Sequence, residues 1–204
     1  PHGSRLLQNQ GDATFVDVTD AAGVSMELAH PKGIYGFSSA FVDLDDDGWD
    51  DLAVAADFRS ARLFWNEGDG TFSDGTEEAE VAKESNAMGS AFGDVDGDGT
   101  LEWFVTSIYE EEQCDDEPEC GLKGNGNRLY RVTGDRVLSS VTDTYGVRDG
   151  GWGWGAAFGD FDNDADVDLW QVDGWPGRDL NGGFVHRTFP ARLWLNDGQP
   201  MSEV

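Results

Sequence analysis

Three acidic stretches decide the fold: DLDDDGWDD at residues 43–51, DVDGDGTLE at residues 94–102 and DFDNDADVD at residues 160–168. We call them loop 1, loop 2 and loop 3. Acidic residues occupy positions 1, 3, 5 and 9 of every loop, and an apolar run follows each one. Because Asp and Gly favour turns, each loop is predicted to join two β-strands.

A second element recurs between the loops. RLLQNQGDATF at residues 5–15 returns as RLFWNEGDGTF at residues 62–72, more loosely at residues 128–138, and as RLWLNDG at residues 192–198. In each copy, apolar residues flank a polar turn, which predicts a β-hairpin. One period therefore holds four strands, the content of one propeller blade. We predict an all-β fold with about three four-stranded antiparallel blades.

The repeats also predict the organisation of the chain as one propeller segment. We expect blades at residues 33–76, 87–142 and 153–204, the last one incomplete, and two outer strands of a preceding blade within residues 1–24. Propellers typically have four to eight blades. The segment is therefore expected to belong to a larger propeller, or to one completed between copies of the chain. Open blade edges would also permit self-association.

The loop carboxylates predict metal sites. Ca²⁺ binds hard oxygen ligands, and alternate side chains of a curled loop can converge on one ion. We predict about three Ca²⁺ ions; the alternative is polar turns without an ion. Loop 3 carries Ala165 where the others have Gly, so its site is expected to be the weakest. The predicted ligands, with the backbone carbonyl at position 7, are Asp43, Asp45, Asp47, Trp49 and Asp51; Asp94, Asp96, Asp98, Thr100 and Glu102; Asp160, Asp162, Asp164, Asp166 and Asp168.

Composition narrows the range of partners. The 204 residues include 13 Lys and Arg against 41 Asp and Glu, a formal charge of −28, together with 8 Trp, 4 Tyr and 12 Phe. The aromatic residues can build a core, whereas the negative charge disfavours nucleic acid and anionic membranes. Apolar runs such as residues 52–56 are far too short to insert into a membrane.

Two cysteines, Cys114 and Cys120, flank the acidic stretch DDEPE. A local disulfide is favoured over free thiols, and it would indicate an oxidising compartment. No histidine lies near them in the sequence, which argues against zinc.

Length variation between the repeats falls between the second and third strands of each blade, on the face opposite the acidic loops. Variable loops on a scaffold often carry recognition, so we expect a protein or glycan ligand there. The candidate binding residues are Trp152, Trp154, Trp175 and Arg178. An alternative for Trp152 and Trp154 is packing near the propeller axis. No catalytic motif is found, and no catalytic residue is predicted.

These motifs together resemble the FG-GAP/VCBS repeat. FVDVTDAAGV at residues 15–24 and the approach to loop 3 at residues 153–160 are most similar to the ASPIC/UnbV and cartilage-acidic-protein-like branch. The resemblance implies an extracellular, Ca²⁺-binding β-propeller like that of integrin α-subunits, with metals bracing the blades. It does not imply one activity.

The expected function is a secreted, non-enzymatic, calcium-binding adhesion module, located outside the cell or at its surface, with the bacterial periplasm as an alternative. Two other functions stay open. The segment could be the propeller domain of a larger secreted polysaccharide hydrolase or lyase, or a structural subunit that assembles through its blade edges.

Overall fold

The computed structural model describes residues 4–26, 34–109, 124–178, 184–187 and 191–204. Three four-stranded antiparallel sheets form its body, which confirms the predicted all-β fold with blade-like sheets. In chain order their strands are β3 (Gly36–Val42), β4 (Asp51–Ala56), β5 (Arg62–Asn66) and β6 (Phe72–Asp74); β7 (Ser90–Gly93), β8 (Glu102–Val105), β9 (Arg128–Gly134) and β10 (Val137–Ser140); β11 (Gly153–Gly159), β12 (Asp168–Asp173), β15 (Arg192–Leu195) and β16 (Ser202–Glu203).

The third sheet departs from the expectation of an incomplete blade. Its fourth strand, β16, is only two residues long, but it pairs with β15 and completes the order β11-β12-β15-β16. The connection from β12 to β15 carries an additional hairpin, β13 (Trp175–Arg178) and β14 (Phe184–Arg187). A single helical turn, α1 (Thr142–Tyr145), follows β10 and ends at Gly146, which has a left-handed φ of 71°.

The first hairpin forms a separate two-stranded sheet of β1 (Leu7–Asn9) and β2 (Phe15–Asp17). Its sequence equivalents β5, β9 and β15 each pair with strands on both sides, whereas β1 pairs only with β2 in the described residues. Within the described part of the chain, the other edge of β1 has no strand partner.

Consecutive sheets share their cores. Strand β8 shows the principle: Trp103 and Val105 pack in a cluster with the first sheet, whereas Phe104 packs in a cluster with the third. Alternate side chains of a strand point to opposite faces, so a sheet buried on both faces needs a continuous apolar run. This explains why Trp103, Phe104 and Val105 follow one another in β8 and are all buried. A third cluster joins Leu52 and Phe64 of the first sheet to the segment after β2.

A threonine after each of the hairpins β1–β2, β5–β6 and β9–β10 fastens the sheet internally. Its hydroxyl oxygen accepts the backbone N–H of the leucine near the start of the third strand, which ties the end of the blade back to its middle. These pairs are Thr19 with Leu6 at 2.9 Å, Thr76 with Leu63 at 3.0 Å and Thr142 with Leu129 at 2.9 Å.

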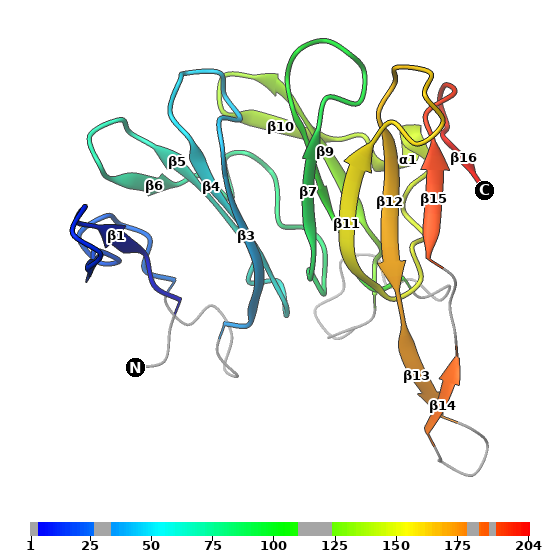
Figure 1. Ribbon diagram of the computed structural model, residues 1–204, viewed down its shortest axis with the longest axis horizontal. Coiled ribbons are helices and arrows are strands. Elements are labelled where there is room, and N and C mark those ends of the chain that lie inside the picture. The colour runs from blue at the N-terminus through cyan, green and yellow to red at the C-terminus, as the bar shows by residue number, and fades with distance from the viewer. Residues whose placement is uncertain (1–3, 27–33, 110–123, 179–183, 188–190) are drawn as a thin grey trace.

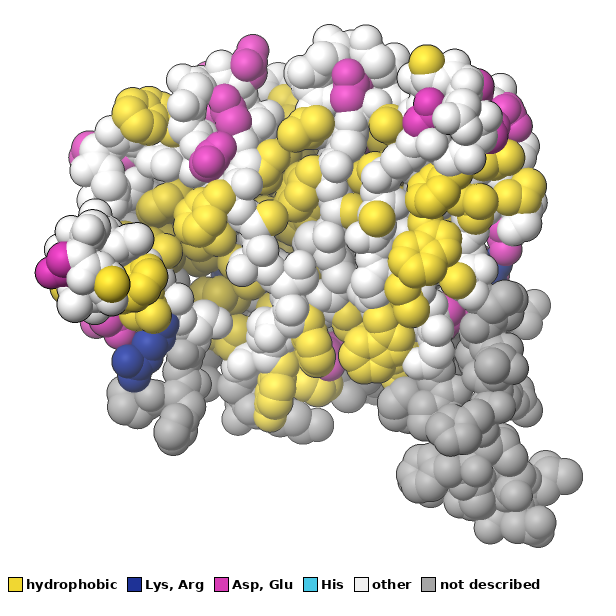
Figure 2. All heavy atoms as spheres, in the orientation of Figure 1, with side chains coloured by type: hydrophobic (Ala, Val, Ile, Leu, Met, Phe, Trp, Pro, Cys, Tyr) yellow, Lys and Arg dark blue, Asp and Glu magenta, His cyan; other side chains and the backbone are white. Residues whose placement is uncertain are grey.

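The acidic loops lie together on one side of the molecule. In Figure 1 the connections from β3 to β4, β7 to β8 and β11 to β12 all lie along the upper edge, while the β13–β14 hairpin extends from the opposite edge. Figure 2 shows acidic side chains along that upper edge. The antiparallel strand order requires this separation of the two faces.

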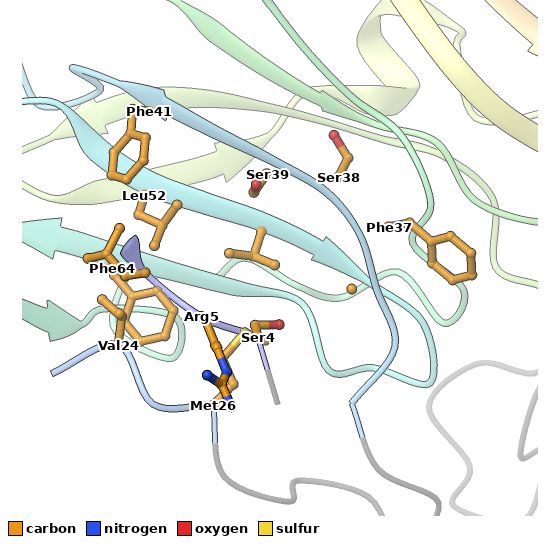
Figure 3. Close-up of a pocket in the computed structure, with 13 residues that line it drawn as sticks. Ser4, Arg5, Val24, Met26, Phe37, Ser38, Ser39, Phe41, Leu52 and Phe64 are labelled. Carbon is orange, nitrogen blue, oxygen red and sulfur yellow. The ribbon is translucent and has the colours of Figure 1, made fainter. Parts of the chain in front are cut away.

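A cavity of about 230 Å³ lies between the first sheet and the segments that precede β1 and follow β2 (Figure 3). Its lining is mostly apolar and includes Val24, Met26, Phe37 and Phe41, with Arg5 at one side. Among the described residues, the helical structure is too short and too polar to span a membrane.

Candidate metal centres

Each acidic loop brings three carboxylates together. The acids at positions 1, 3 and 9 have ligand oxygens within 4.8 Å of one another. Such convergence is what a hard cation requires, and the same three positions contribute in all three loops. The clusters are Asp43, Asp45 and Asp51; Asp94, Asp96 and Glu102; Asp160, Asp162 and Asp168.

The curl of the loops depends on two left-handed residues at positions 4 and 6. Position 6 is Gly48 in loop 1 (φ 90°) and Gly99 in loop 2 (φ 92°), whereas loop 3 places Ala165 there with φ 82°. A residue with a Cβ atom is disfavoured in this region by about 1 kcal/mol. Loop 3 therefore keeps the shape of its siblings at some cost in backbone strain. The residues at position 4 are Asp46, Gly97 and Asn163.

The acid at position 1 organises the turn from inside. The two oxygens of Asp94 accept the backbone N–H groups of Asp98 and Gly99, both at 3.0 Å. Asp43 accepts the equivalent bonds in loop 1, and Asp160 does so in loop 3. These bonds fix the carboxylate in the centre of the loop, so a ligand oxygen is held in place by the local backbone.

The acid at position 9 is buried and links the loop to its sheet. Asp51 is 0% exposed; its oxygens accept the backbone N–H of Leu44 at 3.1 Å and of Asn66 at 2.9 Å. Asp168 makes the matching bonds in loop 3. Burial raises the pKa of Asp51 to about 6, and burial also raises the pKa of Glu102. A cation nearby would favour the ionised form of both groups.

At position 5, Asp47 and Asp98 accept the backbone N–H of position 7 through Oδ1, each at 2.8 Å. Their role as metal ligands remains a prediction. In loop 3, Asp164 joins a further cluster with Asp162 and Asp197. The carbonyl ligands predicted at position 7, Trp49, Thr100 and Asp166, remain predictions.

Three charged residues at the loops were not anticipated from the sequence. Asp197 belongs to the hairpin after β15, at the position that Glu67 occupies after β5. Arg131 and Arg136 form ion pairs with carboxylates of loop 2 and loop 1. Only Asp197 had a signal in the sequence, namely its place in the repeated Asn-acid-Gly turn.

The donor set suits Ca²⁺. All three clusters consist of carboxylate oxygens, the hard ligands that this ion prefers, and contain no sulfur or imidazole donor. The pKa of Asp162 is raised by partial desolvation and by the neighbouring carboxylates of Asp164 and Asp168. Mutual repulsion of this kind is relieved when a cation binds.

The other candidate residues are only partly placed. Trp154 lies within β11, where its ring meets Phe37 edge-on at 6.2 Å and its Nε1 donates to the carbonyl of Gly174 at 2.7 Å. Trp152 immediately precedes this strand. Trp175 and Arg178 are the first and last residues of β13, and only their backbone is described. Cys114 and Cys120, with their predicted disulfide, lie outside the described residues.

The chain is similar in sequence to one known class of repeat proteins. Residues 43–105 match the family model of the FG-GAP-like repeat, a range that begins with loop 1 and ends with β8. The chain is also similar to cartilage acidic protein 1 of Xenopus tropicalis, with 28% identity over 177 residues. That match covers 80% of this chain but 24% of the relative, so the chain spans about a quarter of its length. Together the two matches support an FG-GAP repeat protein.

Proposed function

We propose that this chain is a calcium-stabilised, propeller-like scaffold module without catalytic activity of its own. The observation that carries the proposal is the repeated convergence of acids at positions 1, 3 and 9 in three separate loops. Ca²⁺ would be held by these carboxylates and would neutralise charge that otherwise destabilises the loops. The FG-GAP match and a relative named for cartilage support an extracellular setting, where Ca²⁺ is abundant.

Calcium would act by binding the folded state. Extracellular Ca²⁺ modules commonly have dissociation constants of about 10⁻⁴–10⁻³ M. At 1 mM free Ca²⁺, a site at the tight end of that range adds about 1.4 kcal/mol to the free energy of unfolding. For a chain of this size, that corresponds to a rise of about 3–6 °C in Tm per occupied site.

Thermal unfolding with and without calcium tests the proposal. We expect Tm to rise when 1 mM Ca²⁺ is added to EGTA-treated protein, and to rise less with Mg²⁺, which demands a stricter octahedral geometry. The triple variant Asp43→Asn, Asp94→Asn and Asp160→Asn keeps an oxygen at each position 1 but should lose the response. An unchanged Tm in wild-type protein would reject calcium as a stabilising ligand.

We further propose that the face opposite the acidic loops binds a protein or glycan partner. Its support is the β13–β14 hairpin, which is inserted between β12 and β15 and extends from that edge (Figure 1). Replacing Trp175 and Arg178 together with alanine should abolish binding to a glycan array or to captured partner proteins, while Tm stays the same. Turnover on a polysaccharide panel would instead support the hydrolase or lyase alternative. Concentration-dependent assembly in solution would support a structural subunit.

A further inference from the structure

Arg136 connects the second sheet to the metal loop of the first. It lies in the turn between β9 and β10, and its Nε donates to Asp45 Oδ2 at 2.9 Å across an interval of 91 residues. Its other nitrogens lie 3.5 Å from Asp47 Oδ2 and 3.0 Å from Glu67 Oε1. The side chain of Asp45 is only 4% exposed, whereas that of Arg136 is 31% exposed. A carboxylate of the loop 1 cluster is therefore already paired with a positive charge.

The backbone at Arg136 indicates that the contact is specific. Arg136 has a φ of 55°, in the left-handed region that disfavours side chains. The equivalent turn position in the first sheet is Gly70, with a φ of 91°. The guanidinium also lies over the ring of Trp65, 5.6 Å from its centroid. A residue in an unfavourable conformation, held by contacts to the neighbouring sheet, points to a role for its side chain.

Loop 2 is contacted by a second arginine, from its own sheet. Arg131 on β9 is paired with Asp96 and donates from Nε to Glu102 Oε1 at 3.0 Å. Two of the three convergent carboxylates therefore share one guanidinium. In the other sheets the residues at this strand position are Trp65 and Leu195, which carry no charge.

The role of Arg131 differs from that of the donors in the sibling loops. In loop 1 the acid at position 9 receives a backbone N–H from Asn66 at 2.9 Å, and in loop 3 it receives one from Asn196 at 2.8 Å. In loop 2 the side chain of Arg131 donates instead, so a neutral donor is replaced by a full positive charge.

Loop 3 has no such counter-charge. Among the residues that the structure describes, no ion pair involves a carboxylate of loop 3. Asp197 instead adds another acid to the cluster of Asp162 and Asp164. Its equivalent in the first sheet, Glu67, is neutralised by Arg136. Loop 3 therefore keeps its whole negative charge for an external cation.

We propose that Arg131 and Arg136 are built-in counter-ions that weaken calcium binding at loops 2 and 1, so that loop 3 is the tightest calcium site. This inference rests on the proposed function, and it reverses the order expected from Ala165 alone. A guanidinium bonded to a ligating carboxylate lies roughly 5 Å from an ion on the same carboxylate. At that distance a unit charge weakens binding of a divalent cation by about tenfold in water.

Calorimetric titration of the full chain with Ca²⁺ tests the order of the sites. Single variants Asp43→Asn, Asp94→Asn and Asp160→Asn disable one loop each, with circular dichroism to verify folding. We expect Asp160→Asn to remove the tightest binding event and the other two to leave it in place. Loss of the tightest event in either of the other variants would overturn the proposal.

The arginines are tested in backgrounds that leave one loop intact. In protein carrying Asp43→Asn and Asp160→Asn, Arg131→Gln should tighten binding at loop 2 about tenfold, whereas Arg131→Lys should not. In protein carrying Asp94→Asn and Asp160→Asn, Arg136→Gln and Arg136→Lys test loop 1 in the same way. Arg62→Gln is the matched control, because it removes the same charge from a pair with Asp74 outside the loops. Equal tightening by Arg62→Gln, or none by Arg131→Gln, would overturn the role of the arginines. Absence of Ca²⁺ binding in wild-type protein would instead reject the proposed function itself.

Discussion

Replacing Gly93 with alanine measures how closely the second and third sheets pack. A Cβ atom at Gly93 would lie 2.6 Å from Cγ, 2.8 Å from Cδ2 and 2.9 Å from Cβ of Phe158 on β11. Ordinary carbon contacts are about 3.5–4.0 Å, so the two sheets would have to separate by about 1 Å. The Phe158 ring cannot easily rotate away, because it packs edge-on against Phe104 at 6.3 Å. Overpacking of this kind costs about 1–3 kcal/mol.

Thermal unfolding at fixed Ca²⁺ concentration is the assay. A loss of about 2 kcal/mol in a chain of this length lowers Tm by about 4–8 °C. Gly159→Ala is the matched control, since Gly159 occupies the same place in a second Phe-Gly-Asp sequence. Its Cβ atom would first meet the Phe161 ring at 3.5 Å, an ordinary contact. If Gly93→Ala melts within 1 °C of wild type, or Gly159→Ala loses as much, the packing argument is refuted.

Three further predictions concern stability. Thr142→Val should lower the free energy of unfolding by about 1–3 kcal/mol, because the buried N–H of Leu129 loses its acceptor. Urea titration of this variant and of Thr142→Ser checks the prediction. An equal loss in the serine variant would contradict the role of the hydroxyl. Burial raises the pKa of Glu84 above its ordinary 4.5, so its contribution to stability is fully present below that pH and is lost as pH rises toward the folded pKa. Glu84→Gln should therefore be more stable than wild type at pH 7 but not at pH 4. A gain in stability of the same size at both pH values would refute the raised pKa of Glu84. The formal charge is −28, so repulsion between like charges destabilises the folded chain and NaCl should raise Tm in EGTA. A Tm that does not change with NaCl would count against this repulsion.

The strand order could be predicted from the sequence because the repeats are local. The acidic loops and the Arg-Leu hairpins mark successive strands, and the continuous apolar run of β8 reflects burial on both faces. The β13–β14 hairpin had no such marker, since it has no counterpart in the other repeats. The convergence of positions 1, 3 and 9 follows from the local curl of the loops.

The charge balance at the loops could not be predicted in the same way. Arg136 meets Asp45 only because consecutive sheets stack face to face, and no spacing in the sequence encodes that contact. The expectation that Ala165 weakens loop 3 considered backbone strain alone. It left out the two arginines, which form ion pairs with carboxylates of the other two loops.

The sharing of cores between neighbouring sheets has a consequence for local opening. The second sheet contributes to both large clusters, whereas among the described residues the segments that flank the β1–β2 hairpin contribute only to the third. In a linear stack, units with two neighbours open less often than units at the ends. Amide hydrogen exchange should therefore be slowest in β8 and β9 and should accelerate toward both termini.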